Sequence, residues 1–107
     1  LNDLLAPQLG RTLVLGLVND IDPQVVRARI GVPWYQLGWA VGRWLAGRHP
    51  GGGPRARIAW LPGPADADWV GFIDRGFRDA IAGSAVEIVI ERHGDTGRAI
   101  QRRLVEA

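Results

Sequence analysis

The chain has 107 residues, of which 47% are hydrophobic and 22% are charged, and its formal net charge is +2. This length fits one domain or part of one, and the composition is that of a globular chain. All thirteen basic residues are arginines, and they are interleaved with eleven acidic residues, so no basic stripe of the kind that binds nucleic acid exists. The absence of cysteine excludes disulfides, thiolate zinc sites and cysteine nucleophiles.

The first third of the sequence predicts a helix end and two strands. Residues 1–9 carry leucines on one side of a helix that ends at Gly10, and we expect this helix to be cut by the start of the chain. Residues 12–18 form a continuous apolar run, which is typical of a strand buried in a parallel sheet. After a polar turn, residues 25–32 alternate apolar side chains with arginines, which predicts an edge strand with one solvated face.

The rest of the sequence predicts three helices separated by two strands. Pro33 opens the first helix, which should end near residues 47–49, and Gly38 and Gly42 would let it approach a neighbour closely. Buried strands are expected at residues 57–61 and 86–90. The apolar stripe of the first helix consists of Leu37, Ala40, Val41, Trp44 and Leu45.

The second and third helices follow turns rich in proline, glycine and aspartate. The second should run to about Ala82, before Gly83, and its buried stripe consists of Val70, Ile73, Phe77, Ala80 and Ile81. The third carries Ile100 and Leu104. The expected N-terminal caps of these helices are Asp66 or Asp68 and Asp95 or Thr96.

This alternation of strands and helices predicts an α/β fold with a three-layer, Rossmann-like parallel sheet. In such sheets, ligands bind outside the carboxyl ends of the strands, so the segments after the strands are the first candidates for a site. These segments are residues 19–23, 33–35, 62–69 and 93–96.

Tryptophan is abundant, with five residues, and two of them follow strand ends. Trp34 and Trp69 stand at helix starts, whereas Trp44 and Trp60 occupy positions expected in the core and Trp39 a partly exposed one. Tryptophan is the best cation–π partner among side chains, and aromatic cages recognise quaternary ammonium groups. Ordinary packing is the alternative interpretation for each of them.

The polar residues predict neither catalysis nor a metal or cofactor site. Asp20 and Asp22 are either turn formers or ligand contacts. His93 has no second histidine or cysteine nearby, which argues against a metal site. Ser84 has no histidine close to it in the sequence, so no catalytic triad can be assembled. No phosphate-binding loop is present.

Three segments resemble a known family. The run Gly31-Val-Pro-Trp-Tyr-Gln-Leu-Gly-Trp-Ala-Val-Gly-Arg43 is similar to a segment of the TMAO-binding proteins (TMAO is trimethylamine N-oxide) among the type 1 periplasmic binding proteins. Leu61-Pro-Gly-Pro64 with Trp69-Val and Gly76-Phe-Arg78, and Gly94-Asp-Thr-Gly97 with Ala99-Ile-Gln-Arg102, resemble the next two parts of those proteins. The resemblance begins at about Val18. Within the type 1 family, the pair Trp34-Tyr35 points to the TMAO-binding proteins.

The resemblance implies a fragment of a two-lobed protein, with residues 1–32 ending the N-terminal lobe and residues 33–107 beginning the C-terminal lobe. It implies a periplasmic, non-enzymatic protein that binds TMAO or a similar methylated amine between the lobes and signals to a membrane sensor histidine kinase. Trp34, Tyr35 and Trp69 would line the cleft, and Asp20 and Asp22 are weaker candidates. Exposed sheet edges would permit a homodimer of the fragment.

Other functions of the same fold stay open at this point. One is the effector-binding domain of a LacI-type transcription regulator, and another is a sugar-binding periplasmic protein, since sugars also stack on aromatic rings. An enzyme of Rossmann or flavodoxin-like architecture is disfavoured because the sequence contains neither a nucleotide loop nor a catalytic constellation.

Overall fold

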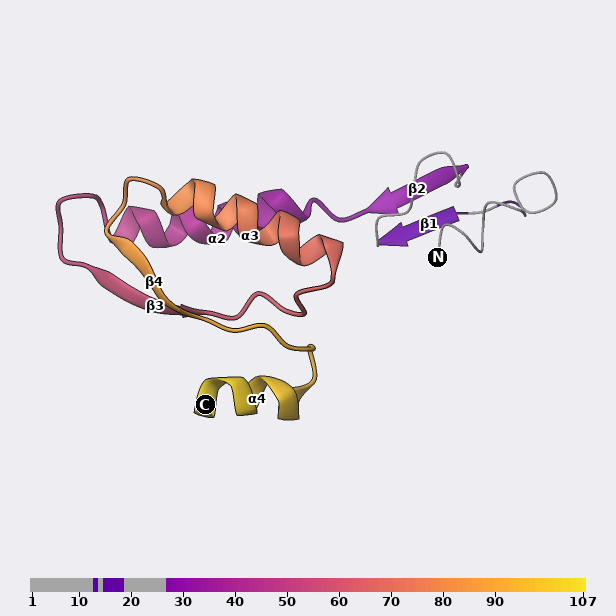
Figure 1. Cartoon of the computed structure of the whole chain (residues 1–107). Coiled ribbons are helices and arrows are strands. Elements are labelled where there is room, and N and C mark those ends of the chain that lie inside the picture. The colour runs from indigo at the N-terminus through magenta and orange to yellow at the C-terminus, as the bar shows by residue number, and fades with distance from the viewer. Residues whose placement is uncertain (1–12, 14, 19–26) are drawn as a thin grey trace. The chain divides into compact units, whose positions relative to one another are not determined.

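The computed structural model describes residues 13, 15–18 and 27–107 (Figure 1). The chain divides into two compact units, Leu1–Pro33 and Trp34–Ala107. The helix expected at residues 1–9 and the turn that carries Asp20 and Asp22 lie outside the described residues. The assignment of the units to two lobes stays a prediction.

The first unit contains two paired strands. β1 (Leu15–Val18) and β2 (Ala28–Gly31) are parallel, with Leu15 opposite Ala28. The expected burial of β1 is wrong for the described side chains, because Leu15 and Leu17 are exposed. All four residues of β2 are exposed as well, so both of its faces are open rather than one. The described part of this unit supplies a two-stranded sheet without a covering layer, which explains the exposure.

The second unit is built from α2 (Trp34–Arg48), β3 (Ala56–Trp60), α3 (Asp68–Ile81), β4 (Val86–Glu91) and α4 (Arg98–Glu106). These bounds lie within one to three residues of the predicted ones. β3 and β4 are parallel, as expected from the helix between them. Figure 1 shows α2 and α3 on one side of this strand pair and α4 on the other, so the layers of an α/β fold are present.

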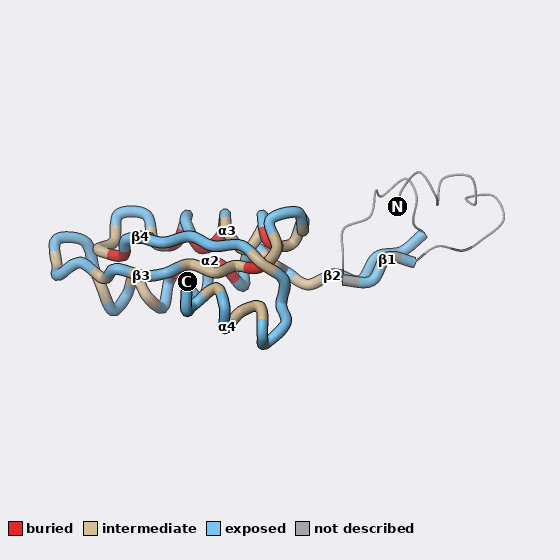
Figure 2. The backbone as a smooth tube through the Cα atoms, turned by 60° about the horizontal axis from the view of Figure 1, so that its bottom comes forward, coloured by how far each residue is buried: buried red, intermediate tan, exposed pale blue. Residues whose placement is uncertain are grey.

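The core of this unit lies between α3 and the strand pair (Figure 2). Phe77 is fully buried and stacks on Trp60, with ring centroids 3.9 Å apart. Val70, Ala80 and Val86 are the other buried apolar side chains, so the predicted stripe of α3 is confirmed at Val70, Phe77 and Ala80, whereas Ile73 and Ile81 are half-buried. The helix ends before Gly83, whose φ of +76° favours glycine.

Glycines hold α2 against α3. A Cβ atom added to Gly38 would overlap the carbonyl oxygen of Ile73, and one added to Gly76 would overlap that of Tyr35. At Gly42 an added Cβ would come within 2.7 Å of the Ala80 Cβ. The predicted close approach at Gly38 and Gly42 is therefore confirmed, and the backbones of the two helices are in direct contact.

The predicted apolar stripe of α2 does not form its packing face. Leu37, Val41 and Trp44 are exposed, Trp44 by 59%. The glycine face turns toward α3 instead, because only residues without a side chain allow so short a distance between helix axes. The prediction that Trp44 belongs to the core is wrong; its ring faces solvent and carries the Arg48 guanidinium 4.3 Å from its centroid.

The expected aspartate caps are also absent. The N-caps of α3 and α4 are Ala67 and Gly97, and neither makes a side-chain capping hydrogen bond. Asp68 lies in the first turn of α3 instead, where its charge complements the positive end of the helix dipole. Asp95 Oδ1 accepts a hydrogen bond from the Thr96 backbone amide at 2.7 Å, within the turn before α4.

A bulge in β4 aligns the segments that follow the two strands. Ile58 pairs with Ile88 but Ala59 pairs with Ile90, so Val89 is the extra residue. Beyond the strands the pairing continues, because the Gly94 amide donates to the Gly63 carbonyl oxygen at 3.2 Å. The loops after β3 and β4 are thereby joined at the carboxyl ends of the strands. None of the described helices is long and apolar enough to cross a membrane.

Candidate ligand-binding site

Two of the predicted site residues come together in space. The indole rings of Trp34 and Trp69 lie 5.3 Å apart between centroids and are tilted by 37°. Trp34 is the first residue of α2 and Trp69 the second of α3, so both stand at the amino ends of their helices. Both side chains are half-buried. We call Trp34 and Trp69 the tryptophan pair.

The parallel contact of the two helices sets the distance within this pair. Gly38 lies against Ile73 and Gly42, one turn further along α2, against Phe77, one turn further along α3, so the two helices run in parallel. Trp34 is one turn before Gly38, and Trp69 is one turn before Ile73. The glycine contacts therefore place the two indoles side by side, at the end of the unit where β3 leads into α3.

Gly63 forms the support beneath Trp69. Its φ is +128°, a conformation that favours glycine. A Cβ atom at this position would lie 3.0 Å from Trp69 Cη2 and 3.0 Å from Val70 Cγ2. The six-membered ring of the indole thus packs directly on the backbone of the turn that the sequence predicted at Pro62-Gly63-Pro64.

The carbonyl oxygen of Gly63 is held by His93. His93 Nδ1 lies 3.1 Å from this oxygen, and His93 Nε2 lies 3.0 Å from Glu91 Oε1. Both partners are hydrogen-bond acceptors, so in each of these contacts the imidazole nitrogen is the donor.

An ion-pair chain continues from Glu91 into α3. Arg78 Nη2 donates to Glu91 Oε2 at 2.7 Å, and Arg78 Nε donates to Asp74 Oδ2 at 2.9 Å. Asp74 Oδ1 also accepts a hydrogen bond from Trp60 Nε1 at 2.8 Å. We call Asp74, Arg78, Glu91 and His93 the polar chain; it connects α3 and the end of β4 to the turn beneath Trp69.

Sequence reasoning missed the polar chain. Asp74 and Arg78 stand four residues apart on a helix, a spacing that predicts an ion pair, and that signal could have been used. Glu91 and His93 gave no comparable signal, because their other partners, Arg78 and the Gly63 carbonyl oxygen, are distant in sequence.

The electrostatics of the polar chain follow from these contacts. Hydrogen bonds from Arg78, and then from His93, lower the pKa of the Glu91 carboxyl. The hydrogen bond to Asp74, and then that to Glu91, raises the pKa of Arg78. All of these side chains keep partial contact with solvent, so each ion pair contributes little to stability on its own.

Glu91 makes folding stability depend on acidity. Its pKa is lower in the folded chain than the ordinary 4.5, so the unfolded chain takes up the proton first as the pH falls. The stabilisation is complete above about pH 4.5 and is lost as the pH falls through the lower folded value. We expect Glu91→Gln to reduce the free energy of unfolding at pH 7 by at most about 1 kcal/mol, and the difference from wild type to shrink toward pH 3.

Urea denaturation at both pH values measures this difference, and Arg78→Ala serves as the matched variant. Without Arg78 the largest cause of the shift is gone, so Glu91→Gln should have a much smaller effect in that background. A wild-type advantage over Glu91→Gln that stays constant between pH 7 and pH 3 would contradict the assignment.

Tyr35 makes a separate contact. Its hydroxyl donates to Asp79 Oδ2 at 2.7 Å, and Asp79 lies more than two turns beyond Trp69 on α3. This hydrogen bond is the main cause that raises the pKa of the Tyr35 hydroxyl. The structure therefore joins Trp34 to Trp69 and directs the hydroxyl of Tyr35 elsewhere on α3, and its role at the ligand stays a prediction.

The described residues do not include every candidate that the sequence suggested. Asp20 and Asp22 lie outside the described residues, so their role also stays a prediction. Trp39 is 43% exposed, as predicted, with Arg43 over its ring. Among the described residues, no group of three or more His, Cys, Asp or Glu side chains could hold a metal ion.

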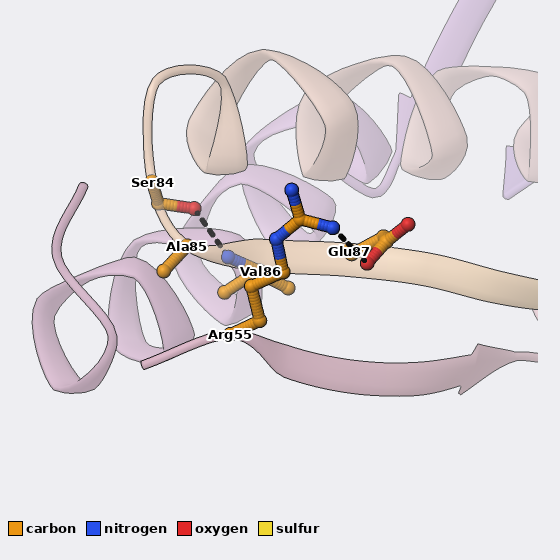
Figure 3. A pocket seen from close by; sticks show the side chains of 5 residues that line it. All are labelled: Arg55, Ser84, Ala85, Val86 and Glu87. Carbon is orange, nitrogen blue, oxygen red and sulfur yellow. Dashed lines mark hydrogen bonds and ion pairs between the residues drawn. The ribbon is translucent and has the colours of Figure 1, made fainter. Parts of the chain in front are cut away.

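A surface pocket of about 230 Å³ lies at the opposite end of the strands, lined by Arg55, Ser84, Ala85, Val86 and Glu87 (Figure 3). Its polar groups bind one another: Arg55 pairs with Glu87 at 3.7 Å, and Ser84 Oγ accepts from the Val86 amide at 3.2 Å. Because the pocket lies at the amino end of β4, it is not at the strand end where α/β folds place ligands.

Comparison with known proteins identifies relatives over nearly the whole chain. Periplasmic protein TorT of Escherichia coli strain K12 is 40% identical over 102 residues, which cover 95% of this chain and 29% of TorT. The TorT protein of E. coli O157:H7 matches equally well. No family model matches the chain. The chain spans less than a third of the length of the curated relatives that it matches.

Solved structures give the same result. A chain from the complex of the TorS sensor domain with TorT, without ligand, superposes with a TM-score of 0.80 at 34% identity, covering 91% of this chain and 34% of that one. In the same complex with TMAO present, the TM-score is 0.76 at 35% identity, over 91% of this chain and 33% of that one.

An ABC-transporter solute-binding protein from Bradyrhizobium sp. BTAi1, crystallised with bis-tris, has a TM-score of 0.75 at 38% identity, over 98% of this chain and 32% of that one. Over nearly its whole length, this chain is therefore similar to one part of these periplasmic binding proteins. The fold predicted from the sequence is thereby confirmed.

The similarity to these relatives bears on two further expectations. The relatives are binding proteins rather than enzymes, as the sequence led us to expect. The curated relatives are periplasmic by name, in agreement with the expected periplasmic location. The expected homodimer of the fragment finds no support among these relatives.

Proposed function

We propose that this chain forms part of the ligand cleft of a periplasmic binding protein that takes up TMAO or a similar small methylated amine and reports to a membrane sensor histidine kinase. The observation that carries the proposal is the tryptophan pair. Trp69 follows β3, at the strand end where α/β folds bind ligands, and Trp34 lies against it from a different helix held in fixed register.

The chemistry of the pair suits a methylated nitrogen. TMAO carries a formal positive charge on nitrogen, shielded by three methyl groups, and an oxide that needs a polar partner. A cation interacts with an indole face when it lies within about 6 Å of the ring centroid. Since the centroids are only 5.3 Å apart, one nitrogen can meet that condition for both rings at once.

The relatives support an amine ligand. One solved structure of the TorS–TorT complex was obtained in the presence of TMAO, and the Bradyrhizobium protein holds bis-tris. Both molecules contain a nitrogen bonded to three carbon substituents. We propose that Trp34 and Trp69 offer π faces to such a group, that Tyr35 lines the same cleft with a smaller contribution, and that Asp20 or Asp22 adds a polar contact.

The proposal that the protein signals rests on its similarity to TorT. TorT is found in complex with the sensor domain of TorS, and we propose that the protein containing this chain engages a sensor kinase in a similar way. Ligand would act by stabilising the lobe arrangement that binds it more tightly, and it can shift that equilibrium only by the difference in its affinities for the two arrangements.

Isothermal titration calorimetry on the intact protein tests the ligand class. We expect heat of binding with TMAO and none with glucose; betaine, which has a quaternary nitrogen but no oxide, separates recognition of the methyl groups from recognition of the oxide. Binding of glucose without binding of TMAO would reject the amine proposal and favour a sugar-binding function of the same fold.

A further inference from the structure

The polar chain ends at the turn on which Trp69 rests. Two independent contacts meet at Gly63: the indole of Trp69 packs on its Cα, and the Gly63 carbonyl oxygen accepts from the Gly94 amide and from His93. The position of the Gly63 peptide therefore limits where the indole ring of Trp69 can lie. Gly63 is buried, so the indole cannot relax into it without moving the turn.

His93 is the member of the polar chain that contacts the Gly63 carbonyl oxygen. Its ring bridges the Gly63 carbonyl and Glu91, and Glu91 is itself anchored to α3 through Arg78. Trp69 belongs to the same helix, about two and a half turns before Arg78. The helix that carries the indole and the turn that supports it are thus connected by side chains as well as by the backbone between them.

We infer that His93 is a positioning residue for the tryptophan pair: by holding the Gly63 carbonyl it sets the geometry of Trp69 against Trp34. It would thereby tune affinity for the ligand without touching it, and this second part rests on the proposed function. A hydrogen bond of this kind changes an equilibrium by about three- to tenfold, so we expect His93→Phe to weaken TMAO binding by about that factor.

The test uses the intact protein labelled with 5-fluorotryptophan and observed by ¹⁹F NMR, each signal being assigned by a Trp→Phe substitution. In His93→Phe, which keeps a flat ring but removes both hydrogen bonds, we expect the Trp69 and Trp34 signals to move and those of Trp39 and Trp44 to stay. His93→Gln, which retains a donor, should return the Trp69 signal toward its wild-type position. His49→Phe, at the far end of α2, should leave the Trp34 and Trp69 signals unchanged.

If the Trp34 and Trp69 signals do not move in folded His93→Phe, the inference is overturned. Equal shifts in His93→Phe and His93→Gln would also overturn it, because a purely steric role of His93 would produce equal shifts. Because this measurement needs no ligand, it is separate from the proposed function. If the wild type does not bind TMAO but the signals behave as expected, the ligand proposal fails and the positioning role stands. If the signals move while the affinity for TMAO is unchanged, His93 does not tune binding.

Discussion

We expect Trp34→Ala to lower the affinity of the intact protein for TMAO by about tenfold or more. A desolvated cation–π contact with tryptophan is worth about 2 kcal/mol, and about 1.4 kcal/mol corresponds to a factor of ten in the dissociation constant. Trp69→Ala should have a similar effect, because its ring lies 5.3 Å from that of Trp34 and would contact the same ligand in the proposed site. Calorimetric titration with TMAO measures both effects.

Trp39→Ala is the matched control for these variants. Trp39 lies on the same helix, is 43% exposed and contacts Arg43 rather than another indole. Its removal should leave the affinity for TMAO within about twofold of wild type, corresponding to less than about 0.5 kcal/mol. Equal losses in the Trp39 and Trp34 variants would show that the pair has no special role.

Gly38→Ala is expected to cause the largest loss of stability. The new Cβ would overlap the carbonyl oxygen of Ile73, which is backbone and cannot move without separating α2 from α3. Overpacking of this kind costs about 1–3 kcal/mol, and occasionally more. Gly76→Ala should behave in the same way, because its Cβ would overlap the carbonyl oxygen of Tyr35. Urea denaturation gives the change in the free energy of unfolding.

Two open glycines supply the controls on the same helices. Gly47 of α2 and Gly71 of α3 have no atom within 4 Å of an added Cβ. Alanine at these positions should raise the free energy of unfolding by about 0.5–1 kcal/mol through better helix propensity. If Gly38→Ala stabilised the chain as Gly47→Ala is expected to, the direct backbone contact between the helices would be contradicted.

The fold of the second unit follows largely from local sequence signals. The period of α3 identified Val70, Phe77 and Ala80 as buried, and Gly83 marked its end. The same method failed for α2, whose apolar stripe at Leu37 and Val41 is exposed. Periodicity shows which face of a helix is apolar but not which neighbour it meets, and the glycines decided that instead.

The candidate site was predictable only in part. Trp34 and Trp69 were predicted separately, because each follows a strand and stands at the start of a helix. The distance between them depends on how the two helices pack, which no local pattern encodes. The same strand-end reasoning nominated Tyr35, although its hydroxyl bonds to Asp79. The polar chain depends on the alignment that the bulge at Val89 gives to the two loops, so its long-range contacts could not be read from spacing.

A crystal structure of the intact protein with TMAO would show whether the tryptophan pair binds the ligand. We expect the TMAO nitrogen to lie within about 6 Å of the ring centroids of both Trp34 and Trp69. A bound TMAO molecule that touches neither indole would contradict it, and the tryptophan pair would then be a packing contact between α2 and α3.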